Sequence, residues 1–155
     1  MKLLFVCTGN TCRSPLAEGI ARREAIRRGL TDVEVESAGT SAWDGGTASD
    51  GAVLVALEHQ IDLTGHRSRQ LTRELVERAD VVLAMGPQHL ERITALGGGA
   101  KSHLLTGYAS AGAPRPISDP YGGELEVYRT TYGELEEEIR RIFDRIAAGQ
   151  GPATA

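Results

Sequence analysis

The sequence predicts an α/β fold, in which a doubly wound, four-stranded parallel sheet carries helices on both faces. Four short apolar runs are typical of buried strands, and segments with helical periodicity separate these runs along the chain. Strands that alternate with helices form right-handed βαβ units, and such units build parallel sheets. Functional sites in these folds lie at the carboxyl ends of the strands, so we expect the site there.

The four expected strands are short. The runs "KLLFV" at 2–6 and "VVLAM" at 81–85 are continuously apolar, which is typical of strands buried on both faces. The run "VEVES" at 33–37 alternates apolar and polar side chains. The fourth strand is expected at "SHLL", around 102–105.

Helical signals separate and follow these strands. The first helix is expected to begin at Pro15, a residue type common at the first helical position, with Ser14 as its cap and Gly29 at its end. The last helix is the clearest, because its apolar residues recur every three or four positions. The remaining expectations are a helix at 51–59, a short helix capped near Thr72, a helix from Pro87 to the glycines at 97–99, and the last helix over 124–147.

The chain of 155 residues is expected to form one domain over 1–148, followed by a flexible tail at 149–155. A loop of about twenty residues is expected between the fourth strand and the last helix, and it contains "ISDPYGG". Loops of that length are often functional, so this segment is a candidate part of the site.

The composition is that of a soluble globular protein, with 41% hydrophobic and 25% charged residues. The net charge is −4 and the basic residues are scattered, so no nucleic-acid partner is expected. Neither a membrane-spanning run nor a signal peptide is recognisable, which makes the cytoplasm the expected location. Two cysteines close together in such a protein favour thiol chemistry over a structural disulfide.

Both cysteines lie in "CTGNTCR", which follows the first expected strand and leads into a helix. A loop of five residues between Cys7 and Arg13 can direct its backbone N–H groups to one point, and the helix dipole strengthens such an anion site. Gly9 and Asn10 are types that tolerate the left-handed conformation this requires. We therefore predict a phosphate-binding loop after the first strand. Its expected phosphate-binding residues are Thr8, Gly9, Asn10, Thr11, Cys12, Arg13 and Ser14.

The residue types in this loop also predict a chemistry. Arg13 offers two parallel donors for phosphate oxygens, and the positive field around Cys7 favours a thiolate that can attack phosphorus. The leaving group then needs a proton, and Asp119 in "SDPYGG" is the candidate general acid. The alternative readings are a buried cysteine beside an incidental arginine, and an ordinary turn aspartate before proline. A nucleotide-binding loop is excluded, because no G-x-x-x-x-G-K-[ST] pattern is present.

The segment "FVCTGNTCRSPLAE", with "DPYGG" far downstream, resembles the low-molecular-weight protein tyrosine phosphatase family. The similarity continues through "SAGTSAW" and "ADVVLAM" and so spans nearly the whole chain. The resemblance implies Cys7 as the catalytic nucleophile and Arg13 as the phosphate clamp. It also implies Ser14 as the hydroxyl that stabilises the thiolate, and Asp119 as the acid that later acts as the base.

The resemblance implies further roles within the loop. Asn10 would shape the loop through hydrogen bonds, with Ser37 and His66 as possible partners or as ordinary polar loop residues. Cys12 would form a reversible disulfide with Cys7 that protects the nucleophile from over-oxidation. The other reading of Cys12 is a small, buried loop residue.

Three positions bear on which phosphorylated side chain is the substrate. Thr11 stands where tyrosine-specific members usually carry an aliphatic residue, and the motifs together resemble the bacterial protein arginine phosphatase branch. Trp43 and Tyr121 could form aromatic walls, which suit a phenyl ring but also stack on a guanidinium group. Phosphoarginine is therefore slightly favoured as the substrate, and phosphotyrosine is the alternative.

The expected partners are phosphorylated proteins, with inorganic phosphate as the product and with neither nucleic acid nor membrane. No cofactor is expected, and no metal, because His59, His89 and His103 lack the spacing of ligands. Two remoter readings are an arsenate reductase, which would need cysteines beyond Cys12, and a non-catalytic phosphate-binding module. Such a module would lack Cys7 or Asp119, and both are present.

Overall fold

The computed structural model describes residues 1–110 and 113–153, and it confirms the predicted fold class. Within these ranges, the strands form a four-stranded sheet in the order β2-β1-β3-β4. Every pair of neighbouring strands is parallel, and Cys7 at the end of β1 pairs with Gly39 at the end of β2. The strands are β1 (Lys2–Cys7), β2 (Glu34–Gly39), β3 (Val81–Ala84) and β4 (Ser102–Leu104).

The helices follow the predicted order, with one addition. The helices are α1 (Arg13–Arg27), α2 (Asp50–Glu58), α3 (Arg73–Arg78), α4 (Pro87–Ala95), α5 (Leu105–Tyr108) and α6 (Leu125–Ala147), with a 3₁₀ turn, η1, at Gly99–Lys101. Thr72 caps α3 as predicted, because its hydroxyl accepts a hydrogen bond from the Leu75 N–H at 3.2 Å. The four-residue helix α5 was not predicted, since so short a segment shows no periodicity.

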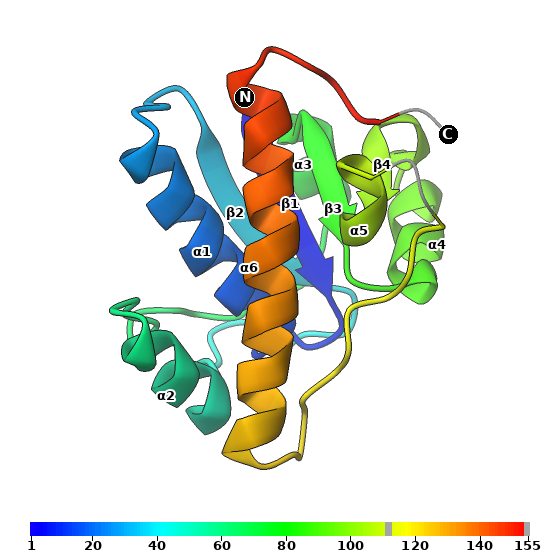
Figure 1. The fold of residues 1–155 in the computed structure, drawn as a ribbon. Coiled ribbons are helices and arrows are strands. Elements are labelled where there is room, and N and C mark those ends of the chain that lie inside the picture. Colours follow the sequence, from blue (N-terminus) through cyan, green and yellow to red (C-terminus); the bar gives the residue numbers. More distant parts are fainter. Residues whose placement is uncertain (111–112, 154–155) are drawn as a thin grey trace.

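The sheet separates two hydrophobic cores, because successive side chains of a strand point to opposite faces. Leu3 and Phe5 of β1 pack in the larger core with residues of α1, α2 and α6. Leu4 and Val6 of the same strand pack in the smaller core with residues of α3 and α4. In Figure 1, α1 and α6 lie over one face of the sheet, with α3 on the other. Layers on both faces hold β1 rigidly, and Cys7 is its last residue.

The start of α1 corrects one prediction. Ser14 is not its cap, because the helix already begins at Arg13 and follows Cys12, which makes no side-chain capping bond. Ser14 lies instead in the first turn, where its hydroxyl is turned toward Cys7. The backbone needs no hydroxyl cap here, since its first N–H groups are the predicted anion site.

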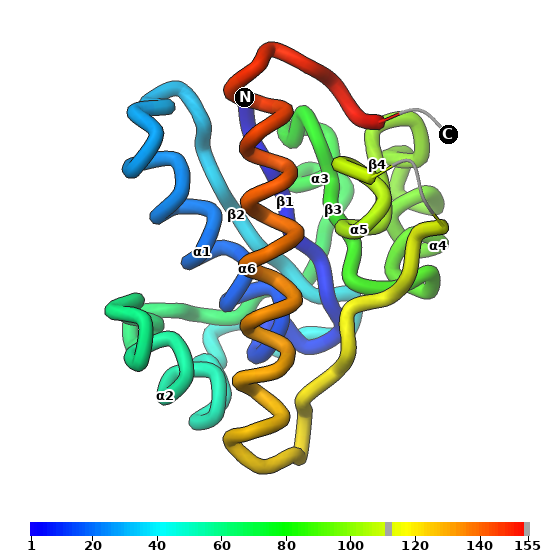
Figure 2. The backbone as a smooth tube through the Cα atoms, in the orientation of Figure 1, coloured from blue at the N-terminus to red at the C-terminus, as the bar shows by residue number. Residues whose placement is uncertain are grey.

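The connection from α5 to α6 returns to the carboxyl end of β1, and its described part is the yellow segment in Figure 2. Backbone hydrogen bonds fix this path: Met85 N–H donates to the Val6 carbonyl at 3.0 Å, and Ile117 N–H donates to the Met85 carbonyl at 2.9 Å. Asp119, two residues beyond Ile117, is thereby held beside the loop that follows β1.

The described part of the tail after α6 contacts both α5 and α6. Ala153 N–H donates to the Tyr108 carbonyl at 2.7 Å, and the Gly151 carbonyl accepts from Arg145 at 2.6 Å. Residues 154–155 lie outside the described residues, so the flexible tail and the domain boundary at 148 stay predictions. None of the helices in the described ranges is long and apolar enough to cross a membrane.

Candidate active site

The loop between β1 and α1 contains one residue with a left-handed backbone conformation. Asn10 has φ 55°, a conformation that asparagine tolerates better than most residues. Of the two residues whose types tolerate this conformation, Asn10 adopts it and Gly9 does not. One such residue is enough to turn the loop into α1.

Gly39, at the end of β2, lets the loop pack against the neighbouring strand. A Cβ atom at this position would lie 2.9 Å from the Asn10 nitrogen and closer still to the Thr8 carbonyl oxygen. Real Cβ atoms essentially never approach other atoms this closely. The close contact of the loop with β2 therefore depends on the missing side chain of Gly39.

The side chain of Asn10 is buried, and both its amide nitrogen and its amide oxygen form hydrogen bonds. Its Nδ2 donates to Ser14 Oγ at 2.8 Å and to Ser37 Oγ at 3.0 Å, and its Oδ1 accepts from the Arg69 N–H at 3.0 Å. Its carbonyl oxygen lies 2.7 Å from His66 Nε2. The expected contacts with Ser37 and His66 are confirmed, and Arg69 is a partner that the sequence did not indicate. These bonds hold the loop in one conformation.

Cys7 lies below the loop and is only 3% exposed. Its Sγ is 2.9 Å from Ser14 Oγ. Because Ser14 Oγ accepts from Asn10, the hydroxyl proton is free to point to the sulfur. The geometry therefore suits a hydroxyl that donates to a thiolate, which is the role that the resemblance implies for Ser14.

Arg13 is the most buried cation of the site, at 5% exposed. Its Nη1 donates to the Ile117 carbonyl at 3.1 Å, and its Nη2 lies 3.5 Å from Asp119 Oδ2. Its Nε is buried and, within the described residues, has no hydrogen-bond partner. An unpaired buried donor is costly, and an oxyanion bound at the loop could accept a hydrogen bond from it.

A cavity of about 430 Å³ opens above the loop. It brings together nearly all of the predicted site residues, which come from the loop, the segment after β2 and the segment before α6. Asn10 and Ser14 do not line it; both are fully buried at 0% exposed and support the loop from within. The predicted residues that line the cavity are Cys7, Thr8, Gly9, Thr11, Cys12, Arg13, Trp43, Asp119 and Tyr121.

The outer wall of the cavity is much more exposed than its base. Asp119 is 54% exposed, and its Oδ1 accepts from the Tyr121 N–H at 3.1 Å, which fixes the turn. The side chains of Trp43 and Tyr121 are 88% and 78% exposed. Two aromatic faces and a carboxylate are thus available to a substrate side chain whose phosphoryl group reaches the loop.

Cys12 has different surroundings from Cys7, although both are free thiols. Its Sγ donates to Ser49 Oγ at 3.3 Å and lies 3.6 Å from the Tyr128 hydroxyl. Burial raises the pKa of Tyr128, so this hydroxyl stays protonated. Ser49 also caps α2 and donates its N–H to the Thr11 carbonyl at 2.9 Å, which ties α2 to the loop.

One contact beside the phosphate-binding loop had no counterpart among the sequence-based predictions. His89 Nε2 lies 2.9 Å from Thr8 Oγ1, and its Nδ1 accepts from the Gly86 N–H at 3.0 Å. Burial, followed by the charge of Arg13, lowers the pKa of His89 to about 4. The sequence offered no signal for this pair beyond the presence of a histidine, because 81 positions separate the two residues.

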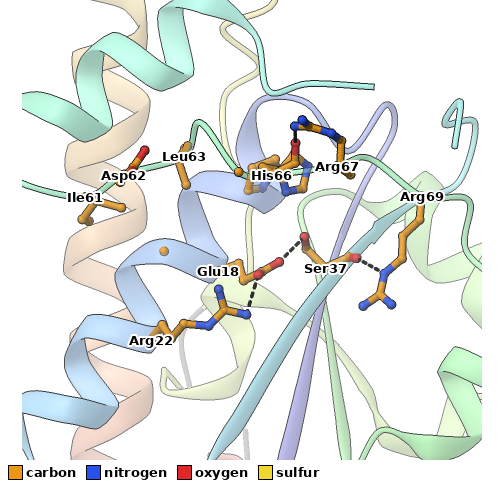
Figure 3. A pocket seen from close by; sticks show the side chains of 12 residues that line it. Glu18, Arg22, Ser37, Ile61, Asp62, Leu63, His66, Arg67 and Arg69 are labelled. Carbon is orange, nitrogen blue, oxygen red and sulfur yellow. Dashed lines mark hydrogen bonds and ion pairs between the residues drawn. The ribbon is translucent and has the colours of Figure 1, made fainter. Parts of the chain in front are cut away.

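A second cavity, of about 470 Å³, lies behind the loop. Figure 3 shows Glu18 between two partners: its carboxylate accepts from Ser37 Oγ at 2.5 Å and pairs with Arg22 at 2.7 Å. Since Ser37 also accepts from Asn10, this cavity borders the network that supports Cys7. Neither cysteine lines it. Within residues 1–110 and 113–153, no group of three or more His, Cys, Asp or Glu residues could hold a metal ion.

The whole chain can be compared with known proteins. The model of the family described as "Low molecular weight phosphotyrosine protein phosphatase" matches residues 2–150. The chain belongs to this family. The resemblance read from the motifs is therefore confirmed, and the chain is a cysteine-dependent protein phosphatase.

Individual relatives of two substrate classes are similar over nearly their full length. The protein-arginine-phosphatase of Bacillus subtilis (strain 168) is 43% identical over 148 residues, which cover 94% of this chain and 97% of that protein. The low molecular weight protein-tyrosine-phosphatase Wzb of Escherichia coli (strain K12) is 34% identical over 148 residues, with 96% and 97% covered. A structure of the YwlE arginine phosphatase, a C7S mutant with a phosphorylated active-site serine, has a TM-score of 0.90 and 41% identity, and the match covers 95% of this chain and 96% of that one.

Proposed function

We propose that this phosphatase hydrolyses phosphoarginine in proteins through a phosphocysteine formed on Cys7. The observation that carries the mechanism is the base of the cavity. There the Cys7 sulfur lies beside the Ser14 hydroxyl, and the buried Nε of Arg13 is unpaired. The phosphorylated serine in the C7S mutant of the YwlE arginine phosphatase supports a covalent intermediate at such a site.

In the first step, the loop N–H groups and Arg13 bind the phosphoryl oxygens, and Cys7 Sγ attacks phosphorus. The S–P bond forms as the P–N bond of the substrate breaks. Asp119 gives its proton to the leaving nitrogen. The distance of 3.5 Å from Asp119 Oδ2 to Arg13 Nη2 supports a role for Asp119 as the acid beside a phosphoryl group that Arg13 binds.

In the second step, water attacks the phosphorus of the phosphocysteine. Asp119, now ionised, takes a proton from that water, and the S–P bond breaks to release inorganic phosphate. The Ser14 hydroxyl, held by Asn10, donates to the departing thiolate and lowers the cost of forming it.

Two observations favour a guanidinium substrate. Thr11 lines the cavity, and its hydroxyl contacts Cys12 Sγ only at 3.7 Å, so it is available to a polar substrate. The arginine phosphatases of Bacillus subtilis and Geobacillus stearothermophilus are 43% and 40% identical to the chain. The second candidate is phosphotyrosine, which the exposed aromatic walls of Trp43 and Tyr121 would accept.

The test compares phosphoarginine and phosphotyrosine in the same peptide context, near neutral pH because the P–N bond is acid-labile. We expect the wild type to prefer phosphoarginine and Thr11→Ile to shift the ratio of kcat/KM toward phosphotyrosine by about ten- to a hundredfold. Thr11→Ser, which keeps the hydroxyl, is the matched control and should retain the preference. A wild type that prefers phosphotyrosine would reject the proposed substrate and leave the cysteine mechanism intact.

We also propose the redox role of Cys12. Hydrogen peroxide oxidises the Cys7 thiolate to a sulfenic acid, and the Cys12 thiol then displaces water from it to form a disulfide. Cys12 must break its bond to Ser49 for this step. Mild peroxide should therefore inactivate the enzyme, and a thiol reductant should restore it in the wild type but not in Cys12→Ser. Equal recovery in both proteins would leave Cys12 a packing residue.

The remaining proposals concern the setting of the enzyme. Phosphorylated proteins are its substrates, with no nucleic acid or membrane partner, and inorganic phosphate is the product. A thiolate nucleophile works in a reducing compartment, so the cytoplasm is the proposed location.

A further inference from the structure

His89 is a fully buried histidine whose hydrogen bonds define its protonation. The Gly86 N–H donates to its Nδ1 at 3.0 Å, and a backbone N–H can only donate. Nδ1 is therefore unprotonated, and the ring proton lies on Nε2. Nε2 is 2.9 Å from Thr8 Oγ1, so the imidazole donates to the hydroxyl.

The surroundings of His89 keep this state fixed. Burial and the charge of Arg13 both disfavour the imidazolium form, and only Asp119 acts in the opposite direction. The pKa of His89 is lowered to about 4, so at neutral pH the ring is a neutral donor through Nε2. His89 is thus built to hold its partner rather than to exchange protons.

Thr8 is held on two sides. Its carbonyl accepts from the Ser41 N–H at 2.9 Å, and its Oγ1 accepts from His89. Because one lone pair of Oγ1 is used in this way, the hydroxyl proton points elsewhere. Thr8 is exposed and lines the active-site cavity together with Asp119.

We propose that His89 is a positioning residue that acts through Thr8. Its Nε2–H fixes the direction in which the Thr8 hydroxyl donates within the cavity that Asp119 also lines. The role rests on the proposed function, because it concerns the departure of the substrate side chain from phosphorus. The phosphoryl oxygens are bound by the loop N–H groups and Arg13, so the binding of inorganic phosphate should not require the Thr8 hydroxyl.

The kinetic test uses Thr8→Val, which removes the hydroxyl and keeps the shape, with Thr8→Ser as the control that keeps the hydroxyl. We expect Thr8→Val to lower kcat by about five- to tenfold on a phosphorylated peptide, the usual effect of one hydrogen bond, while Ki for inorganic phosphate is unchanged. Thr8→Ser should stay within about twofold of the wild type. A parallel loss in kcat and phosphate affinity would overturn the proposal.

A double-mutant cycle tests the action through Thr8. His89→Gln should lower kcat as Thr8→Val does. In the Thr8→Val background, His89→Gln should lower kcat no further. If the losses in kcat of the two single variants multiply in the double variant, His89 acts independently of Thr8 and is a structural residue only. Should His89→Gln fail to fold, the comparison of Thr8→Val with Thr8→Ser still decides whether the hydroxyl matters.

A third readout is independent of activity. Nitrogen-15 NMR of the imidazole at neutral pH should show a neutral His89 ring with its proton on Nε2, and this signal should shift in Thr8→Val. A protonated ring, or a proton on Nδ1, would overturn the proposal even in an active enzyme. Conversely, activity that survives Cys7→Ser would overturn the proposed function and leave this NMR result standing.

Discussion

The base and the rim of the active-site cavity are built in opposite ways. The base consists of Cys7, Asn10, Arg13 and Ser14, of which none is more than 5% exposed. The rim consists of Trp43, Asp119 and Tyr121, each of which is more than half exposed. In the base, hydrogen bonds join Cys7, Ser14 and Asn10, and Arg13 donates to the Ile117 carbonyl, whereas the rim side chains have few bonds to the rest of the protein.

We infer from this difference that the base carries the chemistry and that the aromatic side chains of the rim help to select the substrate. A buried base whose side chains share hydrogen bonds is pre-organised for one reaction, and a change there disturbs several partners at once. An exposed rim can change without disturbing the fold, because little packs on it. This division explains how relatives named as arginine and as tyrosine phosphatases can share one fold. Changes at the base should therefore have large effects, changes at the aromatic side chains of the rim should have small ones, and a change at Asp119 should have an effect that depends on the leaving group.

The largest effect is expected from the nucleophile itself. Cys7→Ser should abolish turnover of an aryl phosphate, because a serine alkoxide is a far poorer leaving group than a thiolate and a phosphoserine formed at this position would not be hydrolysed. Inorganic phosphate should still bind, since the loop backbone and Arg13 remain, and calorimetry can measure that affinity. Substantial residual turnover would contradict a covalent mechanism through Cys7.

Replacement of Asp119 tests whether an exposed residue of the rim takes part in catalysis. Asp119→Ala should slow poor leaving groups by about 10²–10⁴, the range for a lost general acid. An activated aryl phosphate, whose leaving group needs little protonation, should lose much less. Steady-state kinetics on both substrates decide the point, and equal losses would show that Asp119 does not supply the proton.

Asn10→Ala should break the support of the base. It removes the bonds to Ser14, Ser37 and the Arg69 N–H and places alanine at φ 55°, so we expect a loss of about 2–4 kcal/mol in unfolding free energy. Ser37→Ala is the matched control, because it removes one of these partners and keeps Asn10. Urea denaturation of the three proteins measures the difference. A variant as stable as the wild type would mean that the network is not needed for the fold.

The smallest effect is expected at the rim. Trp43→Ala should leave the thermal midpoint nearly unchanged, because the side chain is 88% exposed. It should raise KM for phosphopeptides by less than about tenfold, the value of one exposed stacking contact, with little effect on kcat. A clear loss of stability in this variant would contradict the inference that rim side chains can change without disturbing the fold.

The sequence predicted the fold well because its signals are local. Apolar runs and helical spacing lie within single elements, and the residues from Cys7 to Arg13 are contiguous. What it missed depends on contacts between distant segments. The Thr8–His89 bond and the approach of Arg69 to Asn10 have no local pattern, and Ser14, which was expected as the cap of α1, lies in its first turn.

The close approach at Gly39 has a consequence for variation in this chain. In a library that randomises one position at a time, residue 39 should return glycine alone among active clones, because any side chain would push the phosphate-binding loop off β2. Gly133 offers the contrast, since a Cβ there would meet no atom within 4 Å and many substitutions should survive. Gly39, which has no side chain, is thus among the positions that should tolerate the fewest substitutions.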